Sequence, residues 1–226
     1  MTSKKNTVTI SAQSAKYLAD AMLAAASKDD ATPLICAAQI TVSPDELRGL
    51  ATDRYRVHTV ALNVQSKPKA HEFVMPRDAL LWLSKNALAF TSRRYTAFDP
   101  IVTFTTRAPG EANDDHGYLK LEVRQSLDSG DVEGVISRTG PLVKGNFPPI
   151  GKLFEKARAA ELHAGPFMLK PELLASLRVL GGKWDVPLIR PTASDNPAKP
   201  GPVHFEFKQG DRVFAEALIQ PNLIVR

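Results

Sequence analysis

Two stretches of eleven residues that align without a gap decide the fold of this chain. Residues 73–83 read FVMPRDALLWL, and residues 167–177 read FMLKPELLASL. Each stretch opens with three apolar residues typical of a short strand. Each continues with a proline at the start of an amphipathic helix, where the missing N–H costs nothing. Each also has an acidic residue in the first helical turn, where the helix dipole favours it. The two stretches therefore indicate a repeated structural unit.

Both stretches are followed by three segments whose apolar and polar residues predict strands. The N-terminal part of the chain has the same order, with Ser11 as a plausible N-cap for a helix whose apolar face runs from Ala15 to Ala26. The unit is therefore a strand, a helix and three further strands. The expected strands after the three helices are 34–42, 48–52 and 56–62, then 101–105, 118–123 and 132–137, then 186–190, 203–207 and 213–219.

The repeat predicts an α+β protein built from βαβββ units, with antiparallel sheets that carry helices on one face. An open sheet edge is a liability, so such a unit needs a partner unit beside it. We expect two complete units within residues 1–145 and one unit within residues 146–226.

Composition narrows the functional classes. The chain has 226 residues, a formal net charge of +5 and one cysteine, Cys36. No apolar run approaches the roughly 20 residues of a spanning helix, and no signal peptide is evident. A single cysteine excludes an intrachain disulfide and a cysteine-based zinc site, which indicates a reducing, cytoplasmic compartment. The excess of basic residues is compatible with a polyanionic partner.

Catalytic patterns are missing from the sequence. The five histidines are scattered, and neither H-E-x-x-H nor G-x-S-x-G occurs. The segment 145–153 resembles a phosphate loop only at first sight. It has five residues between its glycines, Leu153 where a magnesium ligand belongs, and two prolines that remove N–H donors. We therefore expect no enzyme activity, no catalytic residues, no metal site and no cofactor.

Four segments, in order, resemble the bacterial DNA sliding clamps, the beta subunit of DNA polymerase III. Residues 51–57, ATDRYRV, resemble the family's A-T-D-G-H-R-L stretch, and Met75–Leu80 resembles its V-P-x-x-A-L helix start. Gly134–Arg138 and Lys144–Ile150 resemble the end of the family's middle domain, and Ala217–Leu223 resembles its terminal V-M-P-M-R-L strand. The resemblance implies the clamp fold. Residues 1–145 then match the middle domain and residues 146–226 half of the last domain, a shortened form that suggests a phage-encoded or divergent relative.

The resemblance also implies two binding surfaces. Family members capture short peptide motifs in a groove, although Arg54 and Gln220 here replace smaller or apolar family residues. The matching positions are Thr52, Arg54, Tyr55, Arg56, Val57, Pro148, Leu153, Leu218, Ile219, Gln220, Pro221 and Asn222. Clamps also line DNA with basic residues on or near their helices, without reading bases. The candidates for DNA contact are Lys16, Arg77, Lys85, Arg93, Arg94, Lys170, Arg178 and Lys183.

Two functions follow as alternatives. One is a homo-oligomeric processivity factor that surrounds double-stranded DNA and tethers a polymerase and other replication proteins. The other is a clamp-like interaction module, without a ring, that binds or competes for the clamp-binding motifs of those proteins. For the groove residues, a purely structural place at a domain junction is a further alternative.

Overall fold

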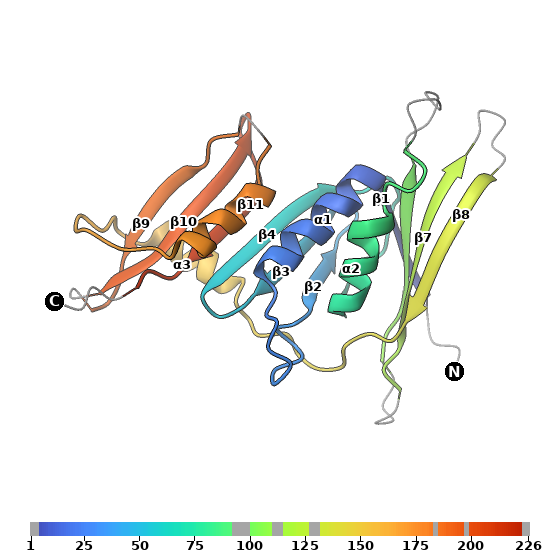
Figure 1. The fold of residues 1–226 in the computed structure, drawn as a ribbon, viewed down its shortest axis with the longest axis horizontal. Coiled ribbons are helices and arrows are strands. Elements are labelled where there is room, and N and C mark those ends of the chain that lie inside the picture. Colours follow the sequence, from blue (N-terminus) through green and yellow to red (C-terminus); the bar gives the residue numbers. More distant parts are fainter. Residues whose placement is uncertain are drawn as a thin grey trace.

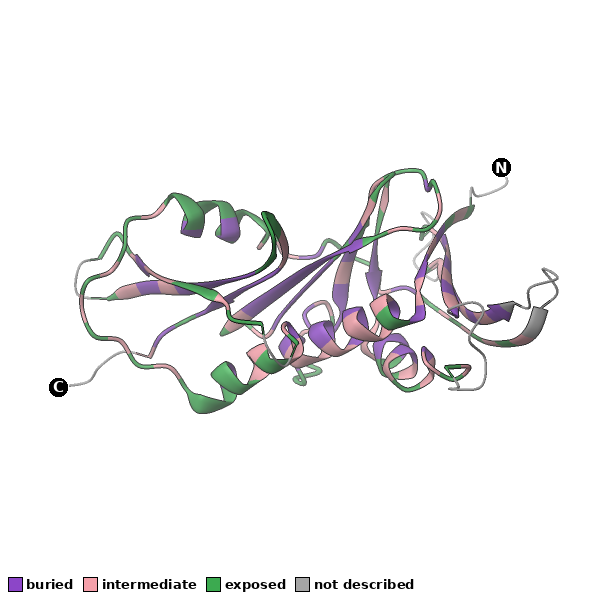
Figure 2. Ribbon diagram, turned by 90° about the horizontal axis from the view of Figure 1, so that it is seen from above, coloured by how far each residue is buried: buried purple, intermediate pink, exposed green. Residues whose placement is uncertain are grey.

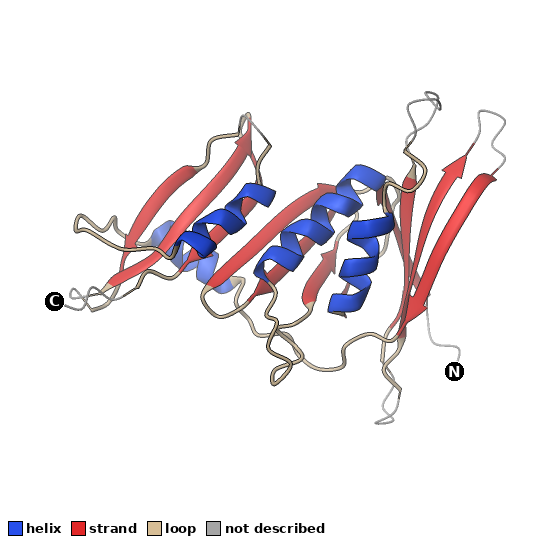
Figure 3. Cartoon of the chain, in the orientation of Figure 1, coloured by secondary structure: helices blue, strands red, loops and turns tan. Residues whose placement is uncertain are grey.

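A computed structural model of the chain describes residues 5–91, 100–109, 115–126, 132–182, 185–196 and 199–222. The described strands form two antiparallel sheets (Figures 1 and 3). In spatial order, the four-stranded sheet contains β1 (Lys5–Ser11), β6 (Ile101–Arg107), β7 (Tyr118–Ser126) and β8 (Val132–Gly140).

The seven-stranded sheet joins distant parts of the chain. Its first four strands come from the N-terminal third, and its last three come from the C-terminal part. In spatial order, it contains β5 (His71–Met75), β2 (Ala38–Val42), β3 (Glu46–Thr52), β4 (Arg56–Asn63), β11 (Arg212–Ile219), β10 (Pro200–Gln209) and β9 (Leu188–Ala193).

The first two βαβββ units exchange their first strands. Strand β1 of the first unit pairs with β6 of the second, and β5 of the second unit pairs with β2 of the first. Each unit thereby covers the sheet edge that the other would leave open. The predicted division at residue 145 remains a prediction, and β4 and β11 pair across it within one sheet.

Most helices form one layer, which packs against both the seven-stranded sheet and the four-stranded sheet. This layer contains α1 (Ala12–Ala25), α2 (Arg77–Asn86), α4 (Pro171–Ala175) and the 3₁₀ helix η1 (Ser176–Val179). The exception is α3 (Lys152–Ala159), which covers the opposite face of the seven-stranded sheet (Figure 2). The larger core lies on the side of the helix layer, and a smaller apolar cluster lies under α3. No helix among the described residues is long and apolar enough to span a membrane.

Close packing of α1 on the sheet depends on one glycine. A Cβ atom at Gly49 on β3 would lie 2.5 Å from Leu18 Cδ1 and 3.0 Å from Met22 Sδ. Both side chains belong to α1 and are completely buried. Gly49 therefore lets α1 approach the sheet closely enough to fill this part of the core.

The predicted fold class is confirmed, and so is Ser11 as the N-cap of α1, since its side chain accepts a hydrogen bond from Ser14 N–H at 3.1 Å. Two strand predictions were wrong in part. Residues 34–37 form a turn, in which Ile35 N–H donates to Thr32 and Cys36 N–H donates to Pro33. Residues 167–169 form no strand and contribute only an isolated bridge between Met168 and Asn222. Helix α3 was not predicted.

Candidate peptide and DNA interface

The proposed groove residues lie along the junction of β4 and β11. The antiparallel register places Leu218 opposite Val57 and Ile219 opposite Arg56. Strand alternation sends Val57 and Leu218 to the α3 side of the sheet, while Ile219 points into the helix-side core. Thus Val57 and Leu218 lie on the α3 face of the sheet, whereas Arg56 and Ile219 lie on the helix-layer face, where Arg56 Nη1 donates to the Glu172 carbonyl at 3.3 Å.

The turn before β4 is held by its own polar side chains. Thr52 Oγ1 donates to the carbonyl of Arg56 at 2.7 Å, and Asp53 Oδ1 accepts from the N–H groups of Tyr55 and Arg56. Arg56 Nε also donates to Asp53 Oδ2 at 2.9 Å. Arg54 has a φ of 77°, a left-handed conformation that favours glycine. The turn therefore presents Arg54 and Tyr55 to solvent in a fixed arrangement.

The C-terminal strand is fastened to this turn. Gln220 N–H donates to the carbonyl of Tyr55 at 2.8 Å, and Asn222 N–H donates to the carbonyl of Met168 at 2.8 Å. Lys170 Nζ lies 5.8 Å from the centre of the Tyr55 ring, within the range of a cation–π contact. The structure thus brings the 52–56 turn and residues 220–222 together, as the resemblance implies.

The apolar floor of this surface is covered by the chain itself. Val57 and Leu218 belong to a buried cluster that also contains Phe147 and Phe154. Phe147 comes from the segment between β8 and α3, and Phe154 is on α3. These two aromatic side chains were missed in the sequence analysis. Phe154 and Ala157 are the only buried residues of α3, so its sequence has too few apolar positions to show a helical period.

Exposure divides the twelve groove candidates into three groups. Arg54, Tyr55, Leu153 and Gln220 are exposed, and the Tyr55 residue is 62% exposed. Arg56, Pro148 and Asn222 are half-buried. The others are buried: Thr52, Val57, Leu218, Ile219 and Pro221. The exposed candidates thus come from the 52–56 turn, from α3 and from the residue after β11, and the apolar floor lies below Phe147 and Phe154.

Helix α3 is fixed in place by a buried ionic cluster. Glu216 Oε1 on β11 accepts from Arg158 Nη1 of α3 at 2.5 Å, and it lies 2.8 Å from His204 Nε2 on β10. The ring of Phe154 also meets that of His204 edge to face. Burial raises the pKa of the Glu216 carboxyl, but the hydrogen bonds from His204 and Arg158 outweigh it and the net pKa is lowered.

The same cluster is the one group of three metal-ligating side chains within the described ranges. It comprises His204, Glu206 and Glu216, all buried. Both carboxylates already have cationic partners, since Glu216 pairs with Arg158 and Glu206 pairs with Lys208 at 2.9 Å. These pairs balance the two negative charges, and the cluster holds α3 against β10 and β11.

Five of the candidate DNA-contact residues are described, and all five lie in or beside the helix layer. Lys85 and Arg178 are exposed, and Lys170 is exposed beside Tyr55. Lys16 forms an ion pair with Asp20 at 2.7 Å, and Arg77 is half-buried with its Nη1 3.5 Å from the Ser27 carbonyl. The other three candidates, Arg93, Arg94 and Lys183, lie outside the described residues.

A cavity of about 560 Å³ lies between the C-terminal end of α1 and the 53–56 turn. Its lining includes Lys28 and Asp29 as well as Arg54 and Tyr55. Lys28 was not among the sequence-based candidates, because nothing in its local pattern indicates that the loop after α1 folds back toward this turn. This cavity, which is lined by residues of both charge signs, lies at the edge of the helix layer next to Tyr55.

Comparison with known proteins shows which solved structures share this fold. No family model matches the chain, and no curated protein matches it either. Solved structures do match. A DNA polymerase III beta subunit from Thermotoga maritima aligns with 97% of this chain and 66% of its own at 12% identity, with a TM-score of 0.63. The chain has the sliding-clamp fold.

A sliding clamp from Pseudomonas aeruginosa, a DNA polymerase III beta subunit bound to griselimycin, aligns equally well. The match covers 96% of this chain and 65% of the clamp at 16% identity, with a TM-score of 0.61. The chain therefore spans about two thirds of the length of these clamps. At such low identity, the match establishes the clamp fold of this chain, and the activity of the longer clamps enters only as a proposal.

Proposed function

We propose that the chain is a sliding-clamp-like processivity factor, which contacts double-stranded DNA through its helix layer and tethers replication proteins through the surface around Tyr55. One observation carries this proposal. α1, α2 and the α4–η1 segment lie side by side on one face, and the basic candidates lie in or beside this layer (Figures 1 and 2). We propose no catalytic activity, cofactor or metal, and a cytoplasmic location.

The chemistry of the helix layer supports weak, sequence-independent DNA binding. Lys85, Lys170 and Arg178 offer exposed cations that can approach phosphates, and phosphate contacts alone carry no base information. Counterion release then makes the affinity fall steeply with salt.

Fluorescence anisotropy with labelled duplexes of unrelated sequence, at two salt concentrations, tests DNA binding. We expect equal affinities for the duplexes and at least a tenfold loss when Lys85 and Arg178 are both changed to glutamine. The matched control changes Lys152 and Lys156 to glutamine, because these exposed residues lie on α3 at the opposite face. A strong sequence preference, or equal losses in both double variants, would contradict the proposal.

The rim around Tyr55 supports binding of a short apolar peptide. Tyr55 and Leu153 are exposed apolar side chains, and Arg54 and Gln220 are exposed polar residues of the 52–56 turn and of the segment after β11. Pockets that combine apolar walls with a few polar groups are the usual design of a small binding cleft. Because the floor is covered by Phe147 and Phe154, the peptide either binds along the rim or displaces this segment.

Calorimetry with a short clamp-binding peptide tests this surface, with an expected Kd near micromolar. We expect Leu153→Asp to weaken binding at least tenfold, since the charge loses water without gaining a partner. Leu81→Asp is the matched control, because both leucines are 41% exposed and Leu81 lies on α2. If the wild type binds no such peptide, the groove residues have only a structural role.

The second candidate function is a clamp-like interaction module without a ring. The observation that favours it is the single βαβββ unit at β9–β11, where longer clamps align over only two thirds of their length. Light scattering separates the two. A ring requires self-association, whereas a module binds peptide as a monomer.

A further inference from the structure

The third unit has the same parts as the second but leaves two of the matching apolar side chains exposed. In the gapless alignment of residues 73–83 with 167–177, Leu80 matches Leu174 and Val74 matches Met168. Leu80 is completely buried, whereas Leu174 is 42% exposed. Val74 is 6% exposed, whereas Met168 is 47% exposed. The same positions are therefore buried in the unit that has a partner and exposed in the unit that lacks one.

In the second unit, Leu80 lies in the core that the first two units share, whereas Val74 is covered by the segment that contains Phe147 and Phe154. Helices α1 and α2 pack in opposite directions, since Arg77 at the start of α2 reaches the Ser27 carbonyl beyond the end of α1 and Ser84 donates to Asp20. The first strand of each unit then pairs with the second strand of the other. A helix pair and two exchanged strands thus complete the domain.

The third unit lacks both elements among the described residues. On one side, η1 meets α1, but no described helix packs along the other side of α4–η1. Strand β9, which occupies the position of β2, is the last strand of its sheet. The C-terminal end of β9 is partly covered by this chain, because His163 N–H donates to the carbonyl of Pro191 and Ala193 N–H donates to the carbonyl of Glu161.

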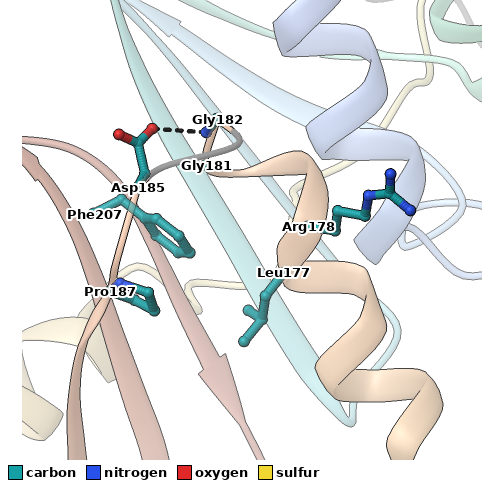
Figure 4. Close-up of a pocket in the computed structure, with 7 residues that line it drawn as sticks. All are labelled: Leu177, Arg178, Gly181, Gly182, Asp185, Pro187 and Phe207. Atoms are coloured by element: carbon teal, nitrogen blue, oxygen red, sulfur yellow. Dashed lines mark hydrogen bonds between the residues drawn. The ribbon is translucent and has the colours of Figure 1, made fainter.

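The N-terminal end of β9 remains an exposed apolar edge. Leu188 and Ile189 are about half exposed, and residues 188–190 have no described neighbour on this side. Next to it, a cavity of about 560 Å³ is lined by Leu177, Pro187 and Phe207 (Figure 4). Exposed apolar edges of this kind pair readily with another chain.

We propose that two copies of the chain complete each other's third unit. Residues 167–169 of each copy pair with residues 188–190 of the other, and the two α4–η1 segments pack in opposite directions. The register follows from the first domain, where Met75, the last residue of β5, pairs with Ala38, the first residue of β2. Accordingly, Leu169 lies opposite Leu188 of the second copy, and Met168 lies opposite Ile189 of the second copy.

A second copy suits this surface better than an unrelated protein. The interface is self-complementary, as a twofold contact requires. Each copy offers both a three-residue open edge and a three-residue apolar segment, 167–169, whose one described bridge is that between Met168 and Asn222. Glu172 and Arg178 are exposed near opposite ends of α4–η1, so antiparallel packing brings opposite charges together.

This inference deepens the oligomeric part of the proposed function but does not depend on DNA or peptide binding. Sedimentation equilibrium from 1 to 100 µM tests it, with an expected mass of twice the 24.7 kDa of one chain. We expect Leu174→Arg to raise the dimer Kd at least tenfold. Leu81→Arg is the matched control, since Leu81 is equally exposed on α2. Circular dichroism checks that both variants are folded.

Disulfide trapping provides a second measurement that does not depend on a destabilising change. Met168→Cys and Ile189→Cys, combined with Cys36→Ala, should form a disulfide between two chains and give a band of twice the mass without reductant. A wild type that stays monomeric throughout the concentration range overturns the proposal. So does a dimer that tolerates Leu174→Arg but is lost on Val135→Arg, which changes an exposed residue on the edge strand β8.

Discussion

The hydroxyl of Tyr17 donates a hydrogen bond to the backbone carbonyl of Leu180 at 2.7 Å. Tyr17 lies on α1 and Leu180 closes η1, so this bond joins the first unit to the third. Burial, with a smaller contribution from the Asp185 carboxylate, raises the pKa of the Tyr17 hydroxyl. The group therefore stays protonated and remains a donor throughout the range in which proteins are usually studied.

Tyr17→Phe should lower the free energy of unfolding by about 1 kcal/mol, because it removes one hydrogen bond and leaves the Leu180 carbonyl without this donor. Urea denaturation followed by circular dichroism measures the change. Tyr55→Phe is the control, since the Tyr55 ring is largely exposed. Equal stabilities for Tyr17→Phe and the wild type would show that the bond contributes nothing.

His58 should make folding sensitive to mild acid. Burial is the main cause that lowers the pKa of His58 to about 4 from its usual value of 6.5. The unfolded chain therefore binds a proton between pH 6.5 and 4 that the folded chain excludes. His58 costs no stability above pH 6.5, and the free energy of unfolding falls by up to about 1.4 kcal/mol per pH unit as the pH drops toward 4.

Urea titrations at several pH values check this dependence. We expect His58→Gln to flatten the slope between pH 6.5 and 4, whatever its effect at neutral pH. His163→Gln, which changes a half-buried histidine outside the core, should keep the wild-type slope. The prediction fails if both variants have the same slope.

Gly49→Ala should destabilise the protein by about 1 to 3 kcal/mol, because the new methyl group would overlap Leu18 and Met22 in the core. Thermal unfolding measures the loss. Gly151→Ala adds the same methyl group where no heavy atom lies within 4 Å. It should leave the melting temperature unchanged or raise it.

Arg54 should contribute less to the stability of the fold than a glycine at the same position would. Its φ of 77° costs a residue with a Cβ atom roughly 1 kcal/mol or more. Arg54→Gly should therefore be about 1 kcal/mol more stable than Arg54→Ala, because both lose the hydrogen bond to Thr32 but only alanine keeps the strain. Chemical denaturation of the two variants decides; an alanine variant as stable as the glycine variant would contradict the argument.

Local patterns were enough to predict most elements of the fold. Ser11, Pro76 and Pro171 indicate where the three helices of the helix layer begin, and residues 101–107 alternate between half-buried and buried positions as their sequence implies. Failures occurred where tertiary packing outweighs local pattern. Residues 167–169 are apolar enough for a strand, but Phe167 and Leu169 pack against the core and the one described bridge of this segment is that between Met168 and Asn222.

The candidate site was harder to predict, because its accessibility depends on contacts between distant segments. The sequence placed Val57 and Leu218 on one surface through the resemblance. Their burial arises from the β4–β11 register together with Phe147 and Phe154, which lie far from both in sequence. The ionic cluster that holds α3 could not be predicted for the same reason. Its members Arg158, His204 and Glu216 come from three elements, and none belongs to a local motif.

The pairing of β4 with β11 has a consequence for how the chain folds. Val60 lies opposite Ala215, so this part of the sheet forms only after most of the chain has been synthesised. Contacts of such long sequence separation slow folding, and β4 presents an unpaired edge until β11 arrives. During synthesis, the nascent N-terminal part is therefore exposed to mispairing along β4, and the order of emergence from the ribosome becomes part of its folding problem.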